Sequence, residues 1–267
     1  MLSWLKTFTL ILTLLPIEND KQFRLVHELD IDADFFYTDP LKNIYAVKEN
    51  QLSKIDFNTF LKTTYSRSSA YIITSIDVSD PLRTLIFYQD FNQVVFIDKQ
   101  LAEMRNPVML DNLGYYNVGA ICNSANKGFW ILDENRLELV YFDSDLTVQK
   151  RSAGLESVIG DRSEGSKIFM LEKNDYIYLG IQDTGILLFD IYGSYIKTFP
   201  LKGVSSFQII DQNIVYHKSG KLYFYHMQNF DEESIELPVS NAKEVRVEGK
   251  YLYIQTRHKI LIYKWDV

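Results

Sequence analysis

A strand-like apolar segment recurs six times along this chain, and this recurrence constrains the fold more than any other feature. Each copy closes at, or just before, an acidic or polar residue. The copies are Leu52–Asp56, Val94–Asp98, Leu137–Phe142, Ile186–Asp190, Leu222–His226 and Ile260–Lys264. From one copy's end to the next, the steps are 42, 44, 48, 36 and 38 residues. Units of this length, each with several short strands, are the sequence pattern of a β-propeller.

The fourth unit shows the internal plan most clearly. Apolar segments at residues 166–173, 176–182, 186–191 and 195–201 are separated by the turns "ND", "DTG" and "YGS". Asn, Asp, Gly and Ser favour turns because they adopt positive φ or cap the local backbone. We therefore predict four strands per unit. The apolar run that ends on Asp190 should be a third strand packed on both faces, which leaves the core at Asp190.

The two ends of the chain complete the repeat count. The sixth unit holds only three strands before the chain stops, and the segment at residues 22–31, "QFRLVHELDI", has no other partner. A blade assembled from both ends closes the ring and removes an exposed sheet edge. The sequence thus predicts an all-β fold, a single six-bladed propeller over residues 22–267. Its blades are four-stranded and antiparallel, and the N-terminal strand closes the last blade.

Charge and cysteine content exclude several classes of function. The formal net charge is −7 and is spread through the chain, whereas a nucleic-acid binder needs a basic stripe. The same charge argues against docking on anionic lipid. Cys122 is the only cysteine and lies in the apolar context "VGAICNS", so we expect a small buried hydrophobe rather than a nucleophile.

The amino terminus carries the one targeting signal. Lys6 precedes an apolar run from Phe8 to Leu15, which Pro16 ends. The run is too short for a membrane-spanning helix and fits the core of a signal peptide. We predict a signal peptide at residues 1–17, export to the periplasm or the periplasmic face of the outer membrane, and no membrane span in the mature chain. No Cys follows the run, so a lipoprotein is not expected; the alternative is a strand or surface anchor that stays attached.

Catalytic signatures are missing from the sequence. It contains no G-x-S-x-G, P-loop, G-x-G-x-x-G or H-E-x-x-H motif. We therefore predict a non-catalytic protein and assign no catalytic residue, cofactor or metal ligand. The alternative is a propeller enzyme, a lactonase-like hydrolase or a lyase, with a metal in its central channel. Its candidate ligands, from first strands, are Asp34, Asp77, Asn123 and Glu244.

Two loops are the candidate partner-binding segments. The loop at residues 153–167 is the longest insertion between units and joins a last strand to the next first strand. The second loop, "DNLGYYNVG", places Tyr115 and Tyr116 side by side. Loops on rigid scaffolds frequently carry function, and exposed tyrosines favour interfaces. The alternatives are a tolerated insertion and aromatic rings that pack back onto the blade. The candidate residues are Tyr115, Tyr116, Glu156, Asp161, Arg162 and Glu164.

In layout, the units resemble NHL-, YncE- and WD40-like propellers. The stretches "ITSIDVSDPLRTLIFYQDFNQVVFIDKQL", "GFWILDENRLELVYFDSDL" and "DTGILLFDIYGSYIKTFPL" are similar to exported envelope propellers of Bacteroidota, a resemblance that covers about residues 30–200. It implies a rigid docking disc in an envelope assembly. The expected partners are other envelope proteins, an outer-membrane translocon or type 9 secretion-associated complex among them, and the expected role is a protein-interaction scaffold.

Overall fold

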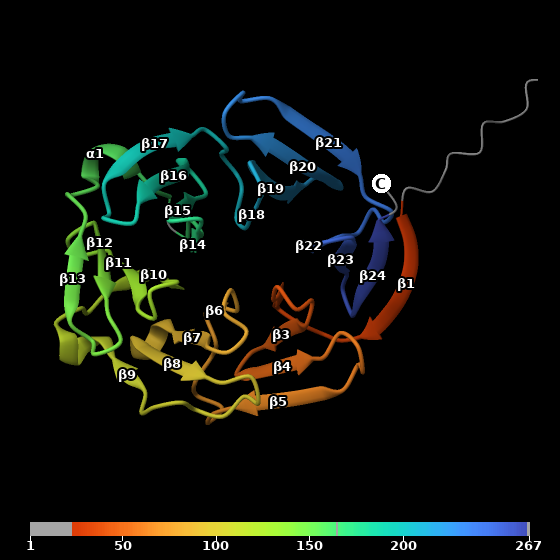
Figure 1. Ribbon diagram of the computed structural model, residues 1–267, viewed down its shortest axis with the longest axis horizontal. Coiled ribbons are helices and arrows are strands. Elements are labelled where there is room, and N and C mark those ends of the chain that lie inside the picture. Colours follow the sequence, from red (N-terminus) through yellow and green to blue (C-terminus); the bar gives the residue numbers. More distant parts are fainter. Residues whose placement is uncertain (1–22, 164, 266–267) are drawn as a thin grey trace, which may run out of the picture.

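The computed structural model describes residues 23–163 and 165–265, which form a closed ring of six sheets around a central channel (Figure 1). Every sheet has four antiparallel strands, and five of the six follow chain order. The six-bladed propeller predicted from the repeat is therefore confirmed. The predicted signal peptide at residues 1–17 lies outside the described residues.

Within each blade, the strands below are given in their order across the sheet, from the channel outward (Figure 1). Blade 1 holds β2 (Phe35–Thr38), β3 (Ile44–Lys48), β4 (Gln51–Ile55) and β5 (Lys62–Ser66). Blade 2 holds β6 (Ser75–Asp77), β7 (Thr84–Tyr88), β8 (Gln93–Ile97) and β9 (Val108–Met109). Blade 3 holds β10 (Val118–Asn123), β11 (Phe129–Asp133), β12 (Glu138–Phe142) and β13 (Val148–Arg151).

The second half of the ring repeats this plan. Blade 4 holds β14 (Ile168–Lys173), β15 (Tyr176–Ile181), β16 (Gly185–Asp190) and β17 (Tyr195–Phe199). Blade 5 holds β18 (Gln208–Ile210), β19 (Asn213–Lys218), β20 (Lys221–His226) and β21 (Glu232–Glu236). Blade 6 holds β22 (Glu244–Glu248), β23 (Tyr251–Gln255), β24 (Lys259–Trp265) and β1 (Phe23–Asp30). The helical segments are η1 (Gln89–Phe91), η2 (Leu110–Leu113) and α1 (Glu156–Ile159).

Strand β1 closes the ring, as the sequence predicts. It pairs antiparallel with β24, from Phe23 opposite Trp265 to Asp30 opposite Lys259. The pairing covers the edge of β24, which would otherwise expose a row of unpaired backbone groups. The two ends of the described chain thus lie in one blade (Figure 1).

A side-chain cap explains why the third strands end where they do. In blade 4, Asp190 Oδ1 accepts hydrogen bonds from the backbone N–H groups of Tyr192 and Ser194, both at 2.8 Å. This cap satisfies turn donors that would otherwise have no partner. The apolar residues of β16 before it are buried, which confirms the prediction for this strand. Blades 1, 2, 3 and 5 have equivalent caps, formed by Asp56, Asp98, Asp143 and His226.

The core lies between neighbouring blades and is built mainly from strand side chains. Trp130 is among the largest fully buried residues, and its indole N–H donates to Glu172 of the next blade at 2.9 Å. Cys122 is fully buried in the same cluster, which confirms its expected role as a small core residue. Among the helices of residues 23–163 and 165–265, none has the length and apolarity needed to cross a bilayer.

Candidate functional site

Every innermost strand runs in the same direction through the ring, so the direction of these strands distinguishes the two mouths of the channel. We call the face where these strands begin the entry face; it also carries the turns between second and third strands. The exit face is where they end, and it carries the first-to-second and third-to-fourth turns. The functional candidates below lie at these two mouths.

Three side chains from different blades close the channel at its waist. The rings of Tyr37 in β2 and Phe169 in β14 are parallel within 8°, with centroids 6.0 Å apart. The guanidinium carbon of Arg246 in β22 lies 4.4 Å from the centre of the Tyr37 ring. These residues line two cavities, a wide funnel of about 1040 Å³ at the entry face and a narrow funnel of about 580 Å³ at the exit face.

Arg246 is the most unusual residue of the waist, since its side chain is only 3% exposed. Its guanidinium donates to Ser206 Oγ at 2.5 Å and to the Phe207 carbonyl at 3.3 Å, and it lies 3.4 Å from a carboxylate oxygen of Glu244. Its Nε has no partner among the described residues. Burial raises the pKa of Tyr37 to about 12, so this phenol stays neutral beside the cation.

The wide funnel is bordered by the long loop at residues 153–167. Asp161 and Arg162 line it, and Arg162 donates to Glu134 Oε1 at 2.7 Å. Glu156 begins α1 and is exposed, whereas Glu164 lies outside the described residues. The loop therefore borders the channel at the entry face; a role for these four residues in partner binding stays a prediction. The charged side chains that line the funnel are three acids and three bases: Glu134, Asp161, Glu244, Arg162, Lys167 and Arg246.

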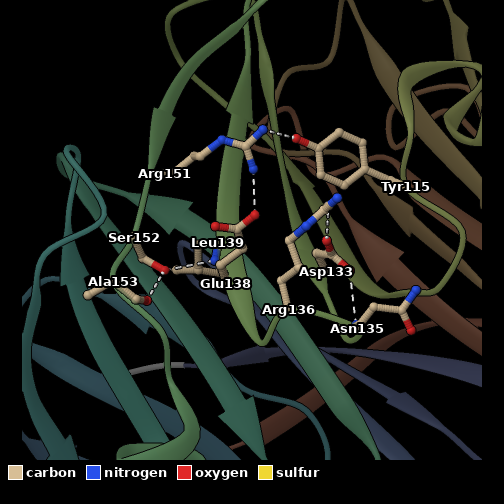
Figure 2. A network of polar contacts seen from close by, with 9 residues as sticks. All are labelled: Tyr115, Asp133, Asn135, Arg136, Glu138, Leu139, Arg151, Ser152 and Ala153. Atoms are coloured by element: carbon tan, nitrogen blue, oxygen red, sulfur yellow. Dashed lines mark hydrogen bonds and ion pairs between the residues drawn. The ribbon is translucent and has the colours of Figure 1, made fainter.

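The structure corrects the expectation of an exposed tyrosine pair. Tyr115 is only 2% exposed and packs edge-on against Phe142, with ring centroids 5.2 Å apart. Its hydroxyl accepts a hydrogen bond from Arg151 at 2.7 Å, and Arg136 lies over its ring (Figure 2). Tyr115 is thus a core residue inside a polar network. Tyr116 points the other way and is 70% exposed, so it keeps its place as a candidate contact.

The narrow funnel combines apolar walls with four carboxylates, none of which forms an ion pair with a described residue, and Glu248 has the weakest hydrogen-bond partners of them. Its aromatic walls come from Tyr37, Phe169 and Phe207. Glu248, the last residue of β22, accepts a hydrogen bond from Thr38 Oγ1 at 3.1 Å, and no cation among the described residues lies within ion-pair distance of it. Burial raises the pKa of Glu248 to about 7. The sequence analysis missed this residue.

The four candidate metal ligands do not converge on one site, and each is engaged by another group. Asp34 forms an ion pair with Lys48 at 2.8 Å, and Glu244 pairs with Arg246. Asp77 Oδ2 accepts the backbone N–H of Asn123 at 2.8 Å. No three His, Cys, Asp or Glu residues in the described ranges are placed to hold a metal ion. None of the chain's four histidines lines either funnel.

Exposed apolar side chains gather on the exit face. Among the described residues, twelve large apolar side chains are exposed, and eight of them lie in the exit-face turns or at the strand ends beside them. Only Ile72 and Tyr116 lie in entry-face loops. We call the eight the exit-face rim: Leu41, Leu61, Leu82, Met104, Tyr176, Tyr192, Tyr195 and Phe230.

Comparison with solved structures shows the fold. The WD40 domain of Neurospora crassa Pan2 matches with a TM-score of 0.61 and 7% identity, over 88% of this chain and 90% of that one. A streptogramin B lyase matches with 0.60 and 13%, over 92% and 88%. BamB from Moraxella catarrhalis matches with 0.52 and 10%, over 91% and 99%. No family profile and no protein of curated function matches the sequence.

Proposed function

We propose that this protein is a non-catalytic protein-interaction scaffold that docks partners on its exit face. The observation that carries the proposal is the exit-face rim, in which Leu61, Leu82 and Phe230 are each at least 59% exposed. Scattered exposed apolar residues are normal on soluble proteins, but their concentration on one face marks an interaction surface. The rim residues come from blades 1, 2, 4 and 5, and they lie on the same face as the narrow funnel.

The proposed setting is the bacterial cell envelope, as a subunit of an outer-membrane or type 9 secretion-associated complex. The support for this setting is in the sequence: the apolar run from Phe8 to Leu15 and the resemblance to exported propellers. Fractionation of cells that express the full chain, with mass measurement of the recovered protein, tests it. Recovery from the periplasm without residues 1–17 is the expected result, and recovery of the uncut chain from the cytoplasm would refute the setting.

Affinity capture with matched variants tests the scaffold role. The tagged protein is recovered from gently solubilised envelopes, and its partners are identified by mass spectrometry. A rim variant carries L61S, L82S and F230S, and a control variant carries I72S on the entry face. We expect a stoichiometric partner with the wild type and the control and its loss with the rim variant. Equal recovery with both variants, or a bare monomer throughout, would contradict the proposal.

The enzyme alternative is kept because the similar structures include a streptogramin B lyase. Two observations favour the scaffold over it: the channel acids Asp77 and Glu244 are engaged by neighbouring groups, and no histidine lines the described funnels. General acid–base chemistry needs a free titratable group within reach of a substrate, and Glu248 in the narrow funnel is such a group, so the enzyme alternative needs its own assay. Incubation with virginiamycin B, followed by mass spectrometry, is the direct assay. Turnover by the purified protein would establish the enzyme instead.

A further inference from the structure

The two mouths of the channel differ in charge. Among the described residues, three acids and three bases line the wide funnel, whereas four carboxylates against two cations give the narrow funnel a formal charge of −2. A cleft of one charge sign with low-dielectric walls concentrates ligands of the opposite sign. The charged residues of the narrow funnel are Asp77, Glu172, Asp211, Glu248, Lys173 and Arg246.

Glu248 is the half-buried acid of this funnel with the weakest hydrogen-bond partners. Asp77 accepts backbone N–H groups from Asn123 and Ser79, and Glu172 accepts the Trp130 indole. Asp211 is exposed at the mouth. Glu248 accepts only two longer hydrogen bonds, from Thr38 Oγ1 at 3.1 Å and Gln208 Nε2 at 3.5 Å, both on the same oxygen. Lys173 and Arg246 act on it electrostatically without an ion pair, and they do not offset its desolvation. A desolvated, unpaired carboxylate gains most from an incoming cation.

We propose that the narrow funnel receives a basic side chain of the docked partner, with its ammonium or guanidinium group on Glu248 and its apolar stem along the funnel walls. This inference rests on the proposed function, because it names what the partner presents to the exit face. The walls suit such a stem, since Val78, Ile209 and Val247 line the funnel beside Phe207. Lysine and arginine bury their methylene stems in this way while the charged head finds a polar group.

The charges around Glu248 set the pH dependence. Lys173 and Arg246 favour its ionised form, Asp39 opposes it, and burial is the largest effect, so its pKa lies at about 7. A cation binds the ionised carboxylate, and binding therefore strengthens as the pH rises through about 7.

The test titrates the folded protein with N-acetyl-lysine methylamide and follows the methyl signals of Ile76, Ile209 and Val247 by NMR. N-acetyl-norleucine methylamide, which has the stem without the charge, is the matched ligand. E248Q removes the carboxylate, and D161N makes the same charge change at the other mouth. We expect saturable shifts with the lysine compound alone, and binding about tenfold weaker in E248Q and at about pH 6 than in the wild type at about pH 8. D161N should bind like the wild type.

Several outcomes would overturn the inference. Equal binding of the norleucine compound would show that the funnel recognises only the apolar stem. Unchanged binding of the lysine compound in E248Q would show that Glu248 does not contact it. The comparison of the two ligands needs no variant, so a folding defect in E248Q does not block the test. If the capture experiment finds a partner that E248Q retains at wild-type strength, the scaffold function stands and the basic side chain is refuted. If no partner is captured but the lysine compound binds, the binding site for a basic side chain is supported and the scaffold function is not.

Discussion

Replacement of Arg246 tests how the waist of the channel is held together. R246M keeps most of the apolar stem but removes the guanidinium, which leaves Glu244 without its cation. Removal of one partner from a fully buried pair costs about 3–5 kcal/mol. Because the Glu244 side chain is 23% exposed, water can solvate part of the orphaned charge, and we expect a loss of about 2–3 kcal/mol in the free energy of unfolding. For a chain of this size, that corresponds to roughly 5–10 °C in Tm.

The double variant E244Q/R246M separates the ion pair from simple packing. It leaves no buried charge at the waist, so it should be more stable than R246M by about 1 kcal/mol or more. Urea unfolding followed by both far-UV circular dichroism and tryptophan fluorescence gives the free energies, provided that the two transitions coincide. The coupling energy between Glu244 and Arg246 is the difference between the effect of the double variant and the sum of the effects of E244Q and R246M. A value within about 0.5 kcal/mol of zero would refute the argument, because the ion pair would then contribute nothing measurable to stability.

Three further predictions concern the turns, the exit face and the ring closure. D190A should lose about 1–2 kcal/mol of unfolding free energy in urea titrations, because two turn N–H groups lose their acceptor, whereas D145A at an exposed turn position should lose less than about 0.5. The raised pKa of Glu248 means that the folded state binds this proton more tightly than the unfolded state. The free energy of unfolding should therefore fall by about 2–3 kcal/mol as the pH rises from about 4.5 to 7, and Glu248 should cause no further change above pH 7. E248Q should abolish that fall, and the exposed control E236Q should keep it; a wild type of constant stability over this range would contradict the assignment. A chain without β1 should aggregate on concentration in light-scattering measurements, because the edge of β24 is then open; a monodisperse monomer would contradict the role of the closing strand.

The fold could be predicted from the sequence because a propeller repeats a local pattern. Each blade is a meander of neighbouring strands, so turn residues and apolar runs within about 40–50 residues carry most of the information. The one long-range pairing, β1 with β24, was predictable because a sixth unit one strand short needs a partner. The caps at Asp190 and its counterparts were visible as polar residues after apolar runs, although their acceptor role came only with the structure.

The candidate site was harder to predict, because its residues come from different blades. Tyr37, Phe169 and Arg246 meet only when the ring closes, and no spacing along the chain records which inner-strand side chains face one another. One signal was available: in "EVRVEG" the charged residues Glu244, Arg246 and Glu248 alternate with two valines, so the three share one face of the strand. Tyr115 was misjudged because two adjacent tyrosines in a loop give no indication of which ring has an arginine partner.

The channel shows why this ring can hold different functions at its two ends. Strands deep within a blade pack against neighbouring blades, so their apolar pattern is fixed by the core. The charged channel-facing side chains of innermost strands lie outside these clusters, which leaves their charge free to differ between blades. Here that freedom yields a balanced entry mouth and an acidic exit mouth, separated by the waist at Tyr37 and Phe169. The apolar rim lies on the same face as the acidic mouth, so a partner docked there as we propose would meet both the rim and Glu248.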